Sequence, residues 1–206
     1  MLPPARPSVP RTAVWTAALV SAAFLAAPAA HAFDYTLPTK PYYAESVMTE
    51  RQRTVNVKVW YTPQKVKFQV GSDGRTMAMI GDKTKSTMTM ILPSRKSYFQ
   101  RSLPAGLFGP LGKTGPGKGM KFEKVGEEEL LGVTTVKYKV TGKNAGGGAF
   151  VGHMWLTDDN IIMRLEGKQT RGERESSIKM DTKVLKMGPV DGTVFAVPDG
   201  YKKMGK

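Results

Sequence analysis

The chain has 206 residues, with 31 Lys and Arg against 17 Asp and Glu, and a formal net charge of +14. Apolar residues make up 40% and aromatic residues 9%, which is enough for a packed core and argues against a disordered chain. The absence of cysteine excludes disulfide scaffolds, thiolate metal sites, thiol catalysis and anchoring through an acylated cysteine.

Residues 1–32 have the organisation of a secretory signal peptide. Arg6 and Arg11 precede an apolar run at residues 13–27, and residues 30–32 (Ala-His-Ala) offer a small-x-small cleavage site. A membrane span needs about 20 apolar residues, so the run favours cleavage; a retained N-terminal anchor is the alternative. Cleavage after Ala32 removes two arginines and no acid, which lowers the net charge from +14 to +12. We therefore expect a free periplasmic protein that is not a lipoprotein, with residues 33–206 as a single domain.

Apolar and polar residues alternate with a period of two from residue 53 onward, which is typical of strands with one buried face. Alternation bounded by turn residues predicts strands at residues 53–61, 65–70, 77–79, 88–92 and 97–100. The second half predicts further strands at residues 121–125, 133–141, 150–156, 161–167 and 173–187, and a short helical turn at residues 189–195. The glutamates at residues 127–129 are assigned to a solvated turn. No segment has a sustained helical period, so the fold class is mainly β, built as an antiparallel meander.

The two halves are separated by a Gly/Pro-rich loop at residues 101–119, which contains six Gly and three Pro. A loop of this length within a domain is usually either functional or a disordered linker. It is therefore a linker, or a lid whose apolar residues Leu107, Phe108 and Leu111 cover a cavity.

The sequence gives little support to catalysis, metal binding or nucleic-acid binding. The Gly112-Lys113-Thr114 sequence lacks the upstream glycine and the strand–helix context of a phosphate-binding loop. His153 is the only histidine after residue 32 and has no recognisable triad partners, so a structural role is favoured over catalysis. We expect no enzyme activity, no cofactor, no metal site and no nucleic-acid partner. A hydrolase dependent on His153 is retained only as a third hypothesis.

Methionine is unusually frequent, with 12 residues in the chain. Met77 and Met79, and Met88 and Met90, are pairs at strand spacing, so each pair faces one side of its strand. Methionine fits irregular or changing apolar partners, but it also fills ordinary cores. Because the chain offers no strong helices to cover a sheet, these side chains could instead line an apolar concavity.

The order of these segments resembles the LolA/LolB-like superfamily of outer-membrane lipoprotein-sorting proteins. The resemblance runs from about residue 44 to residue 204 and is carried by Ser72-Asp73-Gly74 before an alternating strand, by Ile91-Leu92-Pro93 and by the C-terminal motif Phe195-Ala196-Val197-Pro198-Asp199-Gly200-Tyr201. The C-terminal motif is similar to the ending of uncharacterised periplasmic relatives. The resemblance implies a curved, half-open antiparallel β-barrel that holds acyl chains on its concave face. The helices that close the cavity in the carriers have no counterpart in this sequence.

These observations favour a non-enzymatic carrier or binding protein for a lipid, a lipoprotein or another amphiphile. The expected partners are acyl chains, with an anionic membrane surface as a further partner because the chain is basic. The alternative is a structural or interaction module of the cell envelope with no small-molecule ligand. The candidate ligand-binding residues are Phe68, Met77, Met79, Met88, Met90, Tyr138, Met154 and Met163.

Overall fold

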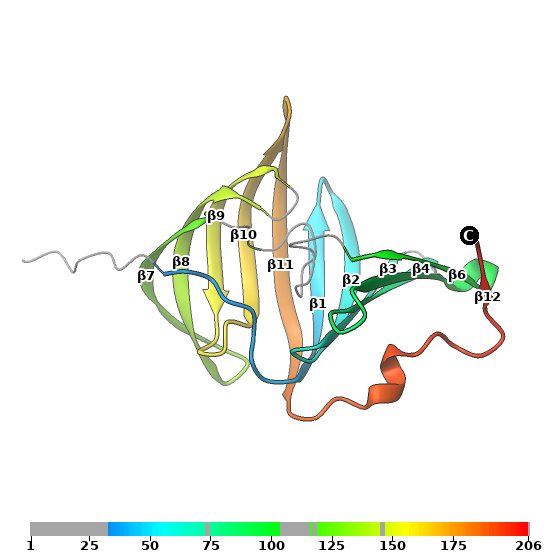
Figure 1. Ribbon diagram of the computed structural model, residues 1–206. Helices are drawn as coiled ribbons and strands as arrows, with labels where there is room; N and C mark the ends of the chain where they lie inside the picture. Colours follow the sequence, from blue (N-terminus) through cyan, green and yellow to red (C-terminus); the bar gives the residue numbers. More distant parts are fainter. Residues whose placement is uncertain (1–32, 73–74, 104–115, 117–118, 145–146, 206) are drawn as a thin grey trace, which may run out of the picture.

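The structure is a computed structural model that describes residues 33–72, 75–103, 116, 119–144 and 147–205. Over these residues the chain is mainly β, and its helical segments are short 3-10 turns (Figure 1). The first half contains β1 (Tyr42–Glu50), β2 (Arg53–Tyr61), β3 (Lys65–Ser72), β4 (Arg75–Asp82), β5 (Thr87–Leu92), η1 (Pro93–Arg95) and β6 (Ser97–Ser102). The second half contains β7 (Lys121–Leu130), β8 (Val133–Lys143), β9 (Ala149–Leu156), β10 (Ile162–Arg171), β11 (Arg174–Met187), η3 (Gly192–Phe195) and β12 (Lys202–Lys203).

All the described strands belong to one 12-stranded sheet, in the order β12-β6-β5-β4-β3-β2-β1-β11-β10-β9-β8-β7. Two antiparallel meanders, β1–β6 and β7–β11, are joined side by side through β1 and β11. The short strand β12 adds to the edge strand β6 in parallel. The sheet curves strongly and is not closed, with β7 and β12 at its two edges (Figure 1). The predicted fold class, a curved half-open antiparallel sheet with little helix, is confirmed.

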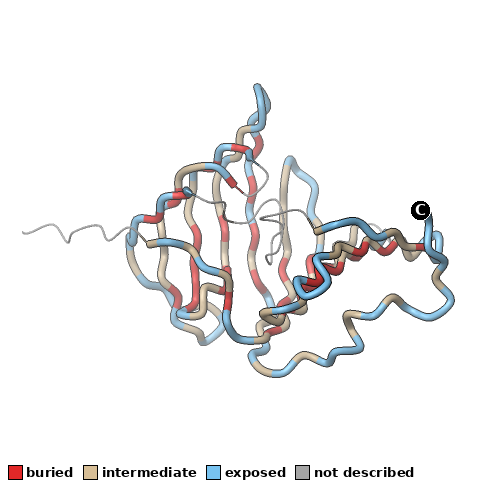
Figure 2. The backbone as a smooth tube through the Cα atoms, viewed as in Figure 1, coloured by how far each residue is buried: buried red, intermediate tan, exposed pale blue. Residues whose placement is uncertain are grey.

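Side chains alternate between two faces of this sheet. One face, which we call the inner face, carries a row of directly paired residues across β1–β6: Ala44, Val59, Phe68, Met79, Met90 and Phe99. The inner face continues across the junction with the row Met48, Met180, Leu165, Met154 and Tyr138. The opposite side, the outer face, carries a row that includes Tyr43, Trp60, Lys67, Ile80 and Thr89. Figure 2 shows the resulting alternation of buried and partly exposed positions along the strands.

The core follows the same division. Two large buried clusters lie along the inner face, one around Met154 and Leu165 and the other around Val59 and Phe68. A third and smaller cluster, Ala78, Ile80 and Ile91, lies on the outer face of β4 and β5. The sheet therefore has apolar surface on both sides, and both sides need a cover.

Two segments differ from the expectation drawn from the sequence. Strand β1 was not predicted, because Ser46 lies on its inner face and Tyr43 on its outer face, so neither face is uniformly apolar. The glutamates at residues 127–129 lie within β7 and not in a turn. The actual turn is formed by Leu131 and Gly132, which both have positive φ values, 55° and 73°. The short helical turn near residue 190 is present as η3.

Candidate functional site

The inner face is covered on one side by the chain's own N-terminal segment. Residues 33–41 cross the β8–β10 region before the chain enters β1 (Figure 1). The Phe33 ring stacks on Tyr138, with ring centroids 4.8 Å apart, and meets Phe122 edge-on at 5.3 Å. The Tyr35 ring also lies over Phe122, at 6.1 Å. Aromatic side chains therefore fill this part of the inner face.

The N-terminal segment is held in place by hydrogen bonds at its far end. The Asp159 carboxylate, in the turn between β9 and β10, accepts from the Thr39 hydroxyl at 2.6 Å and from the Lys40 backbone N–H at 2.9 Å. The buried Tyr61 hydroxyl donates to the Pro38 carbonyl at 2.9 Å. Burial raises the pKa of Tyr61 to about 12, and the charge of Asp159 acts in the same direction. The phenol is consequently a neutral donor at neutral pH, and the segment is a fixed part of the fold.

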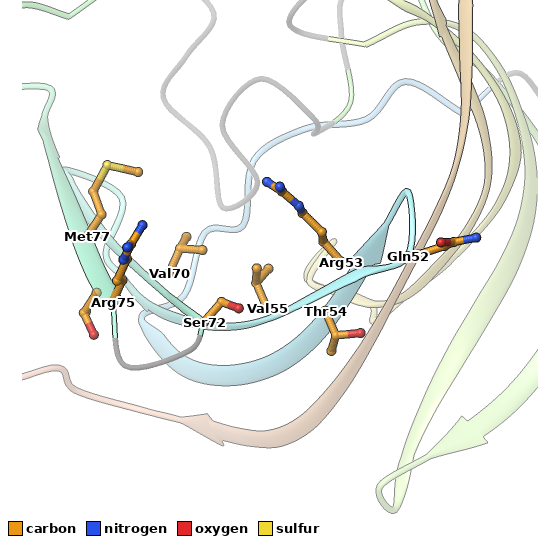
Figure 3. A pocket seen from close by; sticks show the side chains of 9 residues that line it. Gln52, Arg53, Thr54, Val55, Val70, Ser72, Arg75 and Met77 are labelled. Carbon is orange, nitrogen blue, oxygen red and sulfur yellow. The ribbon is translucent and has the colours of Figure 1, made fainter.

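Within the described residues the inner face is buried in the middle of β2 and β3, at Val59 and Phe68, and is more open toward Arg53 and along β4 and β5. Met77 is 44% exposed, whereas Met79, Met88 and Met90 are half-buried. A cleft of about 900 Å³ lies against the beginning of β2, the end of β3 and the beginning of β4. Its lining residues are Gln52, Arg53, Thr54, Val55, Val70, Ser72, Arg75, Thr76 and Met77. Figure 3 shows Val55, Val70 and Met77 on the same side of the sheet as the two arginines.

The rim of this cleft is positively charged. Arg53 and Arg75 are exposed, and neither takes part in an ion pair among the described residues. Glu50 faces Arg53 across β1 and β2, but its carboxylate accepts hydrogen bonds from Gln169 at 2.7 Å and from Ser176 at 3.4 Å. Glu50, the acid paired with Arg53 across the two strands, thus accepts its hydrogen bonds from uncharged side chains.

The structure separates seven of the eight sequence-predicted ligand-binding residues into two groups. Phe68, Met154 and Met163 are buried, with 6%, 0% and 2% of their surface exposed, and they are integral to the core. Met77, Met79, Met88 and Met90 lie together on the open part of the inner face.

Tyr138 is half-buried at the other end of the sheet, under Phe33. The predicted lid residues Leu107, Phe108 and Leu111 lie outside the described residues.

Sequence reasoning missed Arg53 and Arg75 as site residues. A signal was present, because Arg53 lies two residues before Val55 and Arg75 lies two residues before Met77. At strand spacing this places both arginines on the apolar face and not on the opposite, solvated one.

The outer face of β8–β10 carries a charged network with its own partners. Trp155 is 4% exposed and donates its indole N–H to Glu128 at 2.6 Å. Arg164 donates to Glu128 and to Asp181, both at 2.9 Å, and the Lys137 ammonium lies 4.7 Å from the centre of the Trp155 ring. The hydrogen bond from Trp155, assisted by the one from Arg164, lowers the pKa of Glu128. These groups satisfy one another, which explains why Glu128 lies in a strand.

The outer face of β3–β6 is covered by the C-terminal segment, residues 188–204. Phe195 and Tyr201 pack against the small cluster that contains Ile80. The Lys67 ammonium donates to the Val194 carbonyl at 2.9 Å, and burial lowers the pKa of Lys67.

The described residues do not assemble a metal site, and the histidine among them lies away from the cleft. No group of three or more His, Asp or Glu side chains in this part of the chain is placed to hold a metal ion. His153 lies on the outer face beside Trp155, with ring centroids 6.1 Å apart, away from the cleft.

No helix within the described residues is long and apolar enough to cross a membrane.

Comparison with known proteins identifies the fold. No family model and no curated protein matches the chain. An uncharacterized conserved protein from Thermus thermophilus is 12% identical and has a TM-score of 0.56, with 81% of this chain and 90% of that protein covered. MucB is 10% identical with a TM-score of 0.50, and the match covers 79% of this chain and 58% of the MucB chain.

A putative outer membrane lipoprotein-sorting protein domain from Vibrio parahaemolyticus also matches. It is 10% identical with a TM-score of 0.35, and the match covers 76% of this chain and 89% of that domain. At these identities the similarity concerns the fold alone.

Proposed function

We propose that this protein is a non-enzymatic, periplasmic binding protein that holds a lipid or another amphiphile against the open part of its inner face. The observation that carries the proposal is the cleft above β2–β4, whose apolar floor continues into the half-buried methionines of β4 and β5. Its volume of about 900 Å³ is within the range of small-molecule sites. Methionine side chains adapt to ligands of varied shape, which suits a variable acyl chain.

The driving force for this binding is the burial of apolar surface. Each buried methylene contributes about 0.8 kcal/mol, so a ten-carbon chain offers about 8 kcal/mol before the costs of ordering and association. No catalytic group is required.

Native mass spectrometry of the protein purified gently from the periplasm is the first test, followed by organic extraction and lipid analysis. A stoichiometric adduct that extraction identifies as an amphiphile would support the proposal. A protein of bare mass that also fails to bind added lipids would refute it. The same spectrum reports the N-terminus, which we expect to be Phe33 if export removes residues 1–32.

A matched pair of variants tests the assigned surface. M79D/M90D places two charges on the cross-strand pair of half-buried methionines and should abolish lipid capture. V125D/V151D is the control, because Val125 and Val151 are 47% and 58% exposed and lie outside the cleft. If M79D/M90D unfolds, the milder M77D provides the test, since Met77 is already 44% exposed. Full lipid capture by a folded M77D would place the ligand elsewhere.

The alternative is an interaction module of the cell envelope that docks on a protein or an anionic surface. MucB, which has a similar fold, has been solved in complex with MucA. The net charge, +12 after removal of residues 1–32, would support docking by charge, which should weaken steeply as ionic strength rises. Capture of an acyl chain should depend little on salt, so a salt series separates the two functions.

A further inference from the structure

The two arginines at the cleft are placed to act on one ligand. Arg53 begins the inner-face series of β2 just before Val55, and Arg75 begins that of β4 just before Met77. Strands β2 and β4 are separated only by β3, so their axes are about 10 Å apart. Figure 3 shows both side chains rising from the same side of the sheet as Val55, Val70 and Met77. Two guanidinium groups can therefore approach a group held between them.

The local charge is not neutralised within the described residues. Cations elsewhere on the sheet have carboxylate partners, such as Arg164 with Asp181 and Lys179 with Glu166. Arg53 and Arg75 have none among the described side chains, and Glu50, opposite Arg53, accepts from Gln169 and Ser176 through its Oε1. An anion entering the cleft would thus not have to displace any acid of the described residues from an ion pair with either arginine.

The number of donors favours a phosphate over a carboxylate. A guanidinium forms paired hydrogen bonds with a carboxylate or a phosphate, and a single pairing uses both oxygens of a carboxylate. A phosphate monoester has three terminal oxygens and about two negative charges, so it can be shared by guanidinium groups that come from different strands.

We propose that Arg53 and Arg75 bind the terminal phosphate of a lipid phosphate monoester whose acyl chain lies on Val55, Val70 and Met77. This inference rests on the proposed function and adds a headgroup preference to it. The acyl chain would leave the charged rim at Met77 and run toward Met79 and Met90, which are paired across β4 and β5. The cleft then contacts the phosphate and the first part of the acyl chain, and the adjoining methionines contact the rest of the chain.

Calorimetric titration with three soluble probes tests this assignment. The probes are 1-dodecanoyl-glycerol 3-phosphate, 1-dodecanoyl-glycerol and glycerol 3-phosphate, each used below its micelle concentration. We expect the phospholipid to bind at least ten-fold more tightly than the neutral lipid, which corresponds to about 1.4 kcal/mol. Glycerol 3-phosphate should bind far more weakly than either lipid.

The variants R53Q/R75Q and R95Q/R174Q remove the same charge from different places. Arg95 and Arg174 are exposed and do not line the cleft. In R53Q/R75Q the two lipids should bind with affinities within about two-fold of each other, with the neutral lipid binding as in the parent protein. In R95Q/R174Q the ten-fold preference should persist, and circular dichroism confirms that each variant is folded.

Several results would overturn the assignment. Equal binding of both lipids to the parent protein would refute the headgroup preference while leaving the proposed function intact. A preference that survives in R53Q/R75Q would place the phosphate elsewhere. Glycerol 3-phosphate binding as tightly as the phospholipid would indicate a site for free phosphate esters. Failure of both lipids to bind would refute the proposed function, and this inference with it.

Discussion

A pair of glycines in the centre of the second meander is required by the way β9 and β10 approach each other. Gly152 and Gly167 face each other across these strands. A Cβ atom built on Gly152 would lie 2.2 Å from the Glu166 carbonyl oxygen and 2.6 Å from the Gly167 Cα. The Phe150 ring occupies the space that a side chain would need, because its Cζ lies 2.9 Å from the same Cβ position. Phe150 itself is 2% exposed.

We therefore expect Gly152→Ala to destabilise the protein severely. Relief of a 2.2 Å contact needs a backbone displacement of more than about 1 Å, since ordinary carbon contacts begin near 3.5 Å. Overpacking of a core costs about 1–3 kcal/mol, and separation of two paired strands adds the loss of ladder hydrogen bonds at about 1 kcal/mol each. With two ladder hydrogen bonds lost, the sum is about 3–5 kcal/mol, a large fraction of the roughly 5–15 kcal/mol stability of a typical domain.

Urea denaturation followed by circular dichroism measures this loss, with Gly126→Ala as the matched control. Gly126 lies in β7, and nothing lies within 4 Å of a Cβ atom built there, so its free energy of unfolding should change by less than about 1 kcal/mol. The double variant F150L/G152A should not recover stability, because the closest contact is with backbone. A Gly152→Ala protein within about 1 kcal/mol of the parent, at an unchanged m-value, would refute the reasoning.

Three further predictions concern individual side chains. Burial opposes ionisation of Asp82, but hydrogen bonds from a hydroxyl and a backbone N–H, with nearby lysines, lower its pKa. The ionised Asp82 therefore stabilises the folded protein above about pH 4, and this contribution is lost as the pH falls through the lowered pKa. Asp82→Asn should thus cost about 1 kcal/mol at pH 7 and progressively less as the pH falls below about 4, measured by urea denaturation across this range. The pKa of Tyr61 is raised to about 12, so its contribution is complete below about pH 10 and is lost between about pH 10 and 12. Tyr61→Phe should reduce this alkaline loss, followed as melting temperature against pH, and a parallel decline in both proteins would contradict the prediction. Lys67→Met should speed amide hydrogen exchange in η3 while exchange in β3 and β4 stays unchanged, because it removes the bond from Lys67 to the η3 carbonyl.

The sheet could be predicted because its signal is local. A strand with one buried face records that burial as a period of two, so the alternation at Val55, Val57, Val59 and Tyr61 fixes both the strand and its inner face. The turn between β9 and β10 was equally visible, since Asp158, Asp159 and Asn160 favour turn conformations.

The features that the sequence did not indicate depend on partners far along the chain. Strand β1 is stabilised by pairing with β2 and with the distant β11, although Ser46 interrupts its apolar face and bonds to Thr182 at 3.0 Å. Glu128 lies in a strand because Trp155 and Arg164 supply donors from β9 and β10. Thr182 is 136 residues from Ser46, and Trp155 and Arg164 are 27 and 36 residues from Glu128.

The same dependence on distant segments bears on where the proposed ligand would lie. A curved sheet with apolar residues on both faces, and only short helical turns among the described residues, has to use its own tails as covers. The N-terminal segment covers the inner face over β8–β10 through Phe33 and Tyr35, and the C-terminal segment covers the outer face of β3–β6 through Phe195 and Tyr201. The N-terminal segment meets β2 at Tyr61, at the opposite end of that strand from Arg53, and the methionines of β4 and β5 remain partly exposed. The most adaptable apolar side chains thus lie at the part of the sheet that these tails leave open, next to two arginines that form no ion pair with the described residues. A surface of this kind gains the most stability from a ligand that supplies both an apolar chain and a negative charge.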